Sequence, residues 1–148
     1  MLDKRVVFAH VAAELSDKIE ALQIQFDELQ KALKSETKST AGDKHETGRA
    51  MAQLEQEKLS NQLVKTTTLR NALSKVNPNQ IHDVIKYGSL VKTSRGYFFF
   101  SIGLGAVKVG SDEVFCMTAT SPLGKELLGK KTGETIQLNG PIEIIELL

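Results

Sequence analysis

Two carboxylates stand close together in the segment Gly42-Asp43-Lys44-His45-Glu46, between two long stretches of helix-forming residues. Side chains at the turn of a long helical hairpin lie far from the rest of the protein, so they would act on groups of another molecule. Asp43 and Glu46 are therefore candidates for acids that the protein delivers into a cavity of another molecule. The same spacing also fits a capping box, in which Asp43 caps a helix, Glu46 reaches back to it and Gly42 ends the preceding helix. The two interpretations are compatible, because a cap fixes the turn that presents the acids.

The flanking residues predict two helices. Between Val6 and Val76 there is no proline, and glycine occurs only at Gly42 and Gly48. Apolar residues recur in steps of three and four in the first arm, as in a coiled-coil seam: Phe8, Val11, Leu15, Ile19, Leu22, Phe26, Leu29 and Leu33. A weaker stripe in the second arm consists of Met51, Leu54, Leu59, Leu63, Leu69, Leu73 and Val76. We therefore expect an antiparallel coiled-coil hairpin over residues 1–76, with arms of ~30 residues reaching about 45 Å.

Charge favours folding these arms against each other. The first arm carries the acids Glu14, Asp17, Glu20, Asp27 and Glu28. From residue 58 to residue 75 the second arm carries Lys58, Lys65, Arg70 and Lys75 and no acid. A hairpin that turns near Asp43 predicts Asp17 near Arg70 and Glu28 near Lys58. Exposed pairs of this kind contribute ~0.2–1 kcal/mol each, so they would set the register more than the stability.

After Asn77-Pro78-Asn79 the sequence changes to short β-branched or aromatic runs bounded by glycine. The expected strands are Ser89–Thr93, Tyr97–Ile102, Val114–Met117, Thr135–Leu138 and Pro141–Leu147. Ser94-Arg95-Gly96 predicts a hairpin turn, and Ser121-Pro122 predicts the start of a short helix that ends near Gly129. The sequence thus predicts an α+β fold, in which the coiled-coil hairpin (1–76) is followed by a small β-rich domain (77–148) with one short helix.

Composition limits the class of protein. The 19 Lys and Arg residues nearly balance the 18 acids, so net charge gives no reason to expect nucleic-acid binding. The single cysteine, Cys116, cannot form an internal disulfide, and this fits a reducing compartment. Its position in a β run predicts that it lies in the core. The N-terminal apolar run is too short for a signal peptide, and no stretch approaches the roughly 20 apolar residues of a membrane span. We expect a cytoplasmic monomer that has no membrane partner.

Three segments carry a resemblance to a known family. Gly42-Asp-x-x-Glu46 matches the acidic tip of that family's coiled-coil hairpin, and Tyr87-Gly-Ser-Leu-Val91 resembles the entry to its C-terminal domain. The most specific segment is Thr120-Ser-Pro-Leu-Gly-Lys-Glu-Leu-Leu-Gly-Lys-Lys-Thr-Gly-Glu134, which closely resembles the family's C-terminal signature. In these segments and in their order, the chain resembles the Gre-type bacterial transcript cleavage factors, the GreA/GreB family, over nearly its whole length.

The resemblance implies a transcription elongation factor that binds bacterial RNA polymerase and inserts its hairpin through the secondary channel. There it would stimulate the polymerase's own cleavage of the RNA 3′ end in a backtracked complex, without being an enzyme itself. It implies that Asp43 and Glu46 are the catalytic acids that help to hold a Mg²⁺ ion in the polymerase's active centre. Asp43 would be a ligand, and Glu46 would orient the ion or its water. The ion is not expected on the free protein.

The resemblance also implies an FKBP-like fold for residues 77–148. Fold analogy carries no activity, and the few aromatic residues of this half argue against a proline-binding pocket, so prolyl isomerase activity is not expected. Ser121 and Pro122, with one outward ring of Phe98-Phe99-Phe100 in an alternating strand, would mark the polymerase-docking face. Packing and helix capping are the alternative for each of these residues.

The tip departs from the family after Glu46. The family continues Asp-Leu-Arg-Glu-Asn-Ala-Glu-Tyr, whereas this chain has Asp43-Lys-His-Glu-Thr-Gly-Arg-Ala50, so the asparagine and the tyrosine are replaced. Gly48 also costs the second helix about 1 kcal/mol. The alternative function is therefore a secondary-channel inhibitor or regulator without cleavage activity. A third reading is a coiled-coil scaffold with no polymerase role.

The remaining polar candidates are weaker. Lys31, Lys34 and Lys38 fall on one helical face and, with Lys58 and Lys65, would steer the rod toward RNA or an acidic channel. A solvated face is the alternative explanation for these lysines. His45 lies between the two acids, but His10, His45 and His82 have no metal-ligand spacing.

Overall fold

The computed structural model describes residues 2–36 and 43–148, and the side chains of all of these except residue 36 and residues 43–46. Packing divides the chain into two compact units. One consists of Met1–Ala13 with Asn71–Leu148, and the other is Glu14–Arg70. The first unit therefore gathers segments from both parts of the sequence, and the second contains helical arms alone. The division at residues 1–76 and 77–148 follows chain order and stays a prediction.

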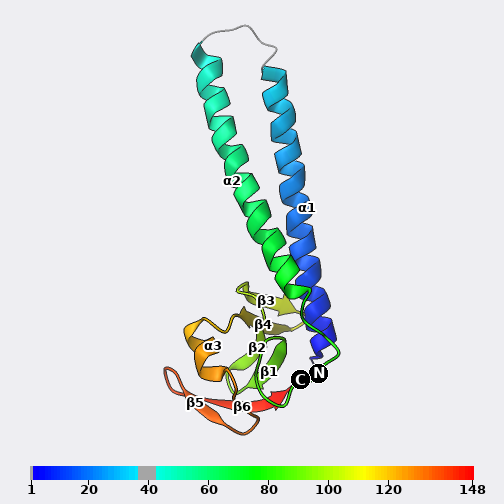
Figure 1. The fold of residues 1–148 in the computed structure, drawn as a ribbon, viewed down its shortest axis with the longest axis vertical. Coiled ribbons are helices and arrows are strands. Elements are labelled where there is room, and N and C mark those ends of the chain that lie inside the picture. The colour runs from blue at the N-terminus through cyan, green and yellow to red at the C-terminus, as the bar shows by residue number, and fades with distance from the viewer. Residues whose placement is uncertain (1, 37–42) are drawn as a thin grey trace. The chain divides into compact units, whose positions relative to one another are not determined.

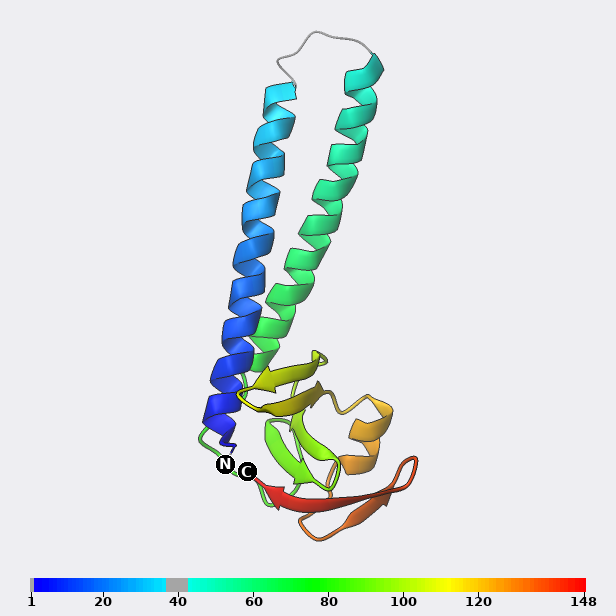
Figure 2. The same ribbon diagram turned by 180° about the vertical axis from the view of Figure 1, so that it is seen from behind.

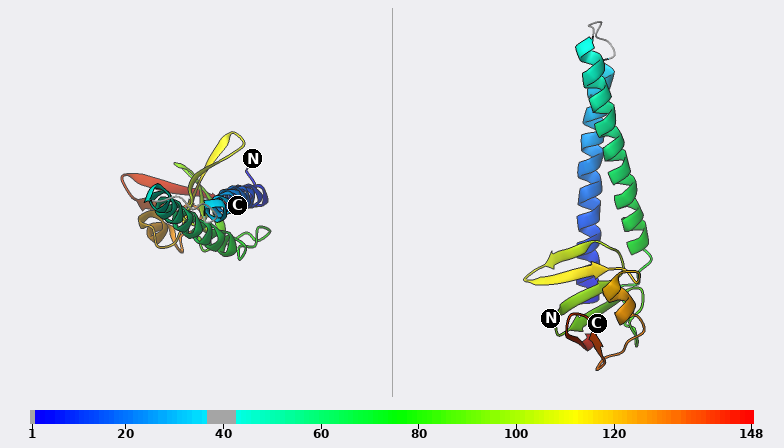
Figure 3. Two further views of the ribbon diagram at one scale, coloured as in Figure 1. Left: turned by 90° about the horizontal axis from the view of Figure 1, so that it is seen from above. Right: turned by 90° about the vertical axis from the view of Figure 1, so that its left-hand side faces the viewer.

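Two long helices form the second unit and continue into the first. Helix α1 is Lys4–Glu36, of 33 residues, and α2 is Asp43–Leu73, of 31 residues. Figures 1 and 2 show their arms side by side and running in opposite directions, and the right-hand view of Figure 3 shows the same. At ~1.5 Å per residue, α1 is about 50 Å long. The predicted helical hairpin is confirmed.

Burial along α1 follows the predicted stripe. All eight residues of the stripe, from Phe8 to Leu33, are buried or half-buried. Val11, Leu15 and Leu22 are at most 7% exposed, whereas Ile24, which lies off the stripe, is 52% exposed. Because the stripe is narrow, it buries one line of side chains and leaves the remaining faces of α1 in water.

The corresponding face of α2 is more polar than the sequence predicts. Met51 and Leu54 are 67% and 66% exposed, so their assignment to the stripe is wrong. The other five residues of the stripe are buried or half-buried: Leu59, Leu63, Leu69, Leu73 and Val76. Toward the turn, Gln56 is half-buried on this face, and Thr66 is buried with its hydroxyl donating to the Gln62 carbonyl at 2.8 Å. With 3.6 residues per turn, positions 52, 56, 59, 63 and 66 share one face, and 51 and 54 fall beside it.

Six strands form the sheet of the first unit. They are β1 Ser89–Thr93, β2 Gly96–Phe100, β3 Gly105–Val109, β4 Asp112–Met117, β5 Thr135–Gln137 and β6 Pro141–Leu147. Their order is β3-β4-β2-β1-β6-β5, and β2 and β4 are parallel while the other neighbours are antiparallel. Helix α3, Pro122–Leu127, follows β4 and is the one helix among the described residues that lies wholly after the hairpin. The predicted α+β class is confirmed, and the likeness to FKBP stays a prediction.

Strand β3 is absent from the sequence-based prediction. It pairs with β4 from Gly105 opposite Cys116 to Val109 opposite Asp112, and it forms one edge of the sheet. Val107 and Val109 are buried, while the residues between and before them are exposed or half-buried. A five-residue edge strand with two apolar side chains leaves a weak pattern in the sequence, and its pairing with β4 decides its conformation.

One apolar cluster joins the sheet to α3. It contains Ile85, Val91, Phe98, Phe100, Met117, Leu127, Ile136, Ile142 and Ile144. Leu127 comes from α3, so the helix covers this face of the sheet, as Figures 1 and 3 show. Cys116 is 1% exposed, which confirms its prediction as a core residue.

The three consecutive phenylalanines correct a prediction. Phe98, Phe99 and Phe100 are 9%, 0% and 1% exposed, so the expectation that one ring faces outward is wrong. Side chains alternate along β2, and both faces of the sheet are buried at this strand. Phe98 and Phe100 belong to the apolar cluster on one face, and Phe99 is buried on the other. The exposed phenylalanine is Phe115 on β4, which is 44% exposed and meets the Phe98 ring edge-on at 6.3 Å between centroids.

Candidate functional site

The two tip acids lie at the start of the second helix. Since α1 ends at Glu36 and α2 begins at Asp43, Asp43 and Glu46 belong to the first turn of α2. Their side chains and that of His45, together with Gly42 and Lys38, lie outside the described residues. The metal-ligand and capping interpretations of Asp43 and Glu46 therefore both stay predictions.

Gly48 follows the acids within α2 and has no structural requirement to be glycine. A Cβ at this position would meet no atom within 4 Å, and the residue does not have a positive φ. Thr47, Gly48 and Arg49 are all exposed. Glycine therefore only lowers helix stability here, at the point where the sequence departs from the Gre-type tip.

The predicted ion pairs between the arms do not form. Asp17, Arg70, Glu28 and Lys58 are all exposed, and neither of the two expected pairs is within ion-pair distance in the described part of the chain. Exposed pairs gain little against hydration and side-chain entropy, so these charges remain in solvent. The register of the hairpin is therefore set by the apolar seam.

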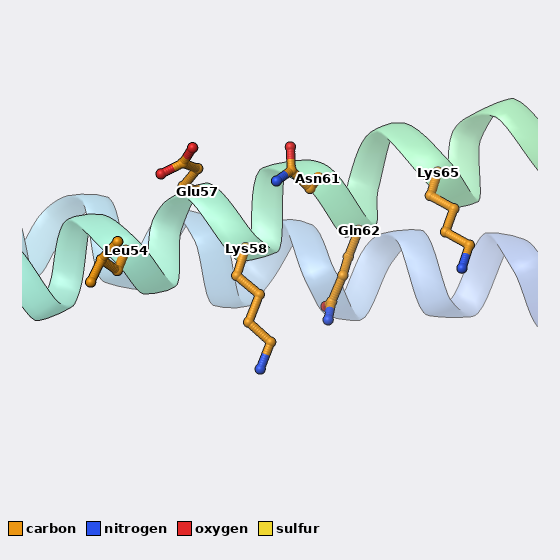
Figure 4. Close-up of a pocket in the computed structure, with 6 residues that line it drawn as sticks. All are labelled: Leu54, Glu57, Lys58, Asn61, Gln62 and Lys65. Atoms are coloured by element: carbon orange, nitrogen blue, oxygen red, sulfur yellow. The ribbon is translucent and has the colours of Figure 1, made fainter.

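Two of the lysines proposed for steering share a groove on α2. Lys58 and Lys65 line it together with Leu54, Glu57, Asn61 and Gln62, and its volume is about 380 Å³. Figure 4 shows Lys58 and Lys65 extending to one side of the helix and Glu57 to the other. All six residues come from α2, so this is a surface groove along a single helix. The steering role of Lys58 and Lys65 stays a prediction, as do those of Lys31 and Lys34.

The Ser121-Pro122 segment begins α3, as the sequence predicts. The Ser121 hydroxyl accepts a hydrogen bond from the Gly124 amide at 3.0 Å and donates one to the Thr118 carbonyl at 2.8 Å. Pro122 occupies the first turn and is exposed. Capping therefore accounts for Ser121, whereas the exposed Pro122 ring is free to contact a partner. Docking of polymerase at Ser121 and Pro122 stays a prediction.

Position 124 must be glycine, because the backbone comes too close there for a side chain. A Cβ built on Gly124 would lie 2.0 Å from the Thr118 carbonyl oxygen and 2.8 Å from the Ser121 hydroxyl. The helix thus approaches the end of β4 so closely that any side chain at position 124 would collide with backbone. Sequence reasoning missed this contact, although the Ser-x-x-Gly spacing of Ser121 and Gly124 was its signal.

A polar cluster at the start of α1 was also missed. Lys4 is 3% exposed, and its ammonium donates to the Gln80 carbonyl. His82 lies within hydrogen-bonding distance of Ser89, at 2.8 Å between Nδ1 and Oγ. Burial, followed by the positive charges of Lys4 and Lys86, lowers the pKa of His82 below its ordinary value, and the nearby Asp83 carboxylate opposes this shift. No sequence motif marks the cluster, because its residues come from α1, the segment before β1, and β1 itself.

This lowered pKa predicts that stability falls in mild acid. The folded protein binds fewer protons at His82 than the unfolded chain, whose histidine titrates near ~6.5, so its contribution is complete above that pH and is lost as the pH falls below it. We expect His82→Gln to be less sensitive than wild type to a change from pH 7.5 to pH 5.5 in urea unfolding. His10→Gln, at an exposed position, is the control. An equal loss of stability in wild type and His82→Gln would contradict the assignment.

The described residues show neither a metal cluster nor a membrane helix. No three or more of their His, Cys, Asp and Glu side chains gather closely enough to hold an ion. None of the helices in this part of the chain combines the length and apolarity of a membrane span.

Among the comparisons with known proteins, only the comparison with solved structures finds a likeness. No protein-family profile matches the chain, and no curated protein matches it. The chain is similar to a solved structure described as that of the transcription factor Gfh1, with 18% identity over 92% of this chain and 92% of that chain. The TM-score is 0.37.

Proposed function

We propose that this chain is a Gre-type transcription factor that binds RNA polymerase in the cytoplasm and acts as a monomer. Its hairpin enters the secondary channel and stimulates the polymerase's own cleavage of backtracked RNA. The observation that carries the proposal is the position of the acids: Asp43 and Glu46 lie in the first turn of α2, the second of two antiparallel helices of 33 and 31 residues. The resemblance of the three sequence segments to Gre-type factors supplies the partner.

The hairpin suits delivery of a small acidic group into a deep channel. Two paired helices with one apolar seam are narrow, and their arms are roughly 45–50 Å long. The acids lie in the first turn of α2, so they are at the end of the hairpin that would enter the channel first. Docking of the first unit on the polymerase through the exposed Pro122 turn would anchor the protein outside the channel.

Asp43 and Glu46 fit a shared Mg²⁺ site better than a site of their own. Mg²⁺ demands six oxygen ligands in near-octahedral geometry, and in proteins it is usually held by one or two carboxylates with waters and substrate phosphates. Two carboxylates supply part of such a set, and the polymerase and the RNA would supply the rest. When bound, the ion supplies an activated water and charge stabilisation at the phosphate. The chain itself contributes ligands and their orientation, and it is not the enzyme.

Transcript cleavage in a purified backtracked polymerase complex tests this function. We expect wild type to shorten the labelled RNA in Mg²⁺-containing buffer, and Asp43→Ala/Glu46→Ala to lose about 100-fold or more of that rate, as when a charge-stabilising group leaves a reacting centre. Asp17→Ala/Glu28→Ala removes two exposed acids from α1 and should stimulate cleavage as wild type does. Both double variants should still bind polymerase. Equal cleavage by the tip variant and wild type would exclude the assigned roles.

Inhibition without cleavage is the second candidate function. Gly48 favours it, since it weakens the helix next to the acids and nothing in the fold requires it. In the same assay an inhibitor would slow elongation and leave the RNA length unchanged with both wild type and the tip variant. A scaffold unrelated to transcription would not bind polymerase at all.

A further inference from the structure

A pocket of about 580 Å³ lies within the first unit, and none of its lining residues belongs to α3 or to the tip segment. Three chain segments form it: the start of α1, the segment before β1, and the end of β6. Its apolar lining is Leu2, Pro78, Ile81, Leu147 and Leu148. Figures 1 and 2 show the start of α1 beside the end of β6. The other half of the lining is polar or charged: Asp3, Lys4, Arg5, Asn79 and Glu146. The volume is that of a small-molecule site.

Lys4 is the polar group that distinguishes this pocket. It lines the pocket, yet only 3% of its surface is exposed. Its ammonium donates to the carbonyl of Gln80, which stands between the lining residues Asn79 and Ile81. The ammonium is therefore held at this wall of the pocket. It has three donors, and a backbone carbonyl satisfies only one of them.

No carboxylate among the described residues neutralises Lys4. The ion pair of this region joins the Arg5 guanidinium to Asp3 at 3.1 Å, so those two charges offset each other. Glu146 also lines the pocket but forms no ion pair with Lys4, and it stands opposite Lys92 in the pairing of β1 with β6. A buried ammonium without a counter-charge is costly, and an anion that enters the pocket would relieve that cost.

We propose that this pocket binds an aliphatic carboxylate, with the acid group on Lys4 and the chain against Leu2, Ile81 and Leu147. Ile81 is 70% exposed at the pocket, so its side chain is accessible to a ligand there. Both a fatty acid and the C-terminal residue of a peptide have this chemistry. The site is independent of the proposed polymerase function.

Calorimetric titration of the full chain with octanoate and with N-acetyl-leucyl-leucine tests the proposal and distinguishes the two sources. We expect saturable binding of at least one of the two, with a Kd of about 1 mM or below, and no binding of the uncharged octanol. Lys4→Met removes the charge and retains much of the side chain's length. It should weaken binding about tenfold or more, whereas Lys18→Met, at an exposed position of the same helix, should bind like wild type.

Ile81→Glu provides a second variant whose folding is not in question, since Ile81 is exposed. The added carboxylate should repel the ligand and weaken binding by a similar factor. Absence of saturable binding of both probes to wild type would overturn the proposal. Binding that neither Lys4→Met nor Ile81→Glu reduces would also overturn it, because the ligand would then lie elsewhere.

Discussion

Replacing Gly124 with alanine should destabilise the first unit by about 3 kcal/mol, a large effect for the addition of a single methyl group. The new Cβ would lie 2.0 Å from the Thr118 carbonyl oxygen. Because this oxygen belongs to backbone, a rotamer change cannot relieve the collision, and α3 would have to move away from β4. Such a movement would separate Ser121 from the Gly124 amide and would also pull Leu127 out of the core cluster.

Urea unfolding, monitored by tyrosine fluorescence, measures the stability of the first unit. Tyr87 and Tyr97 are the two tyrosines of the chain, and both lie in the first unit. Gly48→Ala is the matched control, since it makes the same chemical change in open space on α2, where we expect up to about 1 kcal/mol of added helix stability. Unchanged stability of Gly124→Ala would mean that α3 can shift without cost.

The consequence for function follows from the position of the cap. If the Pro122 turn docks on polymerase, Gly124→Ala should reduce polymerase binding, because it displaces that turn. If the proposed function is correct, Asp43→Ala/Glu46→Ala should leave binding intact and slow cleavage by about 100-fold or more. The two variants therefore separate the docking of the factor from the chemistry at its tip.

Phe99→Ala should cost about 3–5 kcal/mol, the second large effect, since Phe99 is fully buried and truncation leaves a cavity. Phe115→Ala removes the same side chain from the neighbouring strand β4, where it is 44% exposed. Its edge-on contact with Phe98 is worth about 1 kcal/mol, and we expect a loss of that size. Urea unfolding of the two variants side by side measures the contrast.

The contrast between the two phenylalanines tests the corrected view of the sheet. If one face of β2 were exposed to solvent, either Phe99→Ala or the pair Phe98→Ala and Phe100→Ala would lose little free energy of unfolding, and the other would lose much more. The structure instead predicts that Phe99 and Phe100 are both costly to truncate, because each is at most 1% exposed. Equal, small losses for Phe99→Ala and Phe115→Ala would contradict this arrangement.

Local patterns were sufficient for much of the fold. The step of three and four along α1 predicted its buried stripe, and the bounds of β1 and β6 match the predicted Ser89–Thr93 and Pro141–Leu147. Ser121 and Pro122 predicted the start of α3. Each of these features depends on residues that are neighbours in the chain, and their periodicity or capping chemistry is therefore visible in the sequence.

Features that depend on distant partners were missed or wrong. Met51 and Leu54 are apolar, but the phase of the α2 face is set by packing, and they fall outside it. The predicted charge pairs do not form, since the seam sets the register and exposed charges prefer water. Edge strand β3 and the burial of all three phenylalanines depend on which elements cover the sheet.

The candidate sites divide in the same way. The acids at the tip belong to one short segment, and the resemblance to Gre-type factors rests on three such segments. The amino-acid sequence was therefore enough to propose the chemistry of the tip. The pocket around Lys4 is invisible in the sequence, because its walls come from residues 2–5, 78–81 and 146–148. Folding brings these segments together and buries the Lys4 ammonium with a single carbonyl partner. Burial of a charge is a property of three-dimensional packing, and no local pattern of residues encodes it.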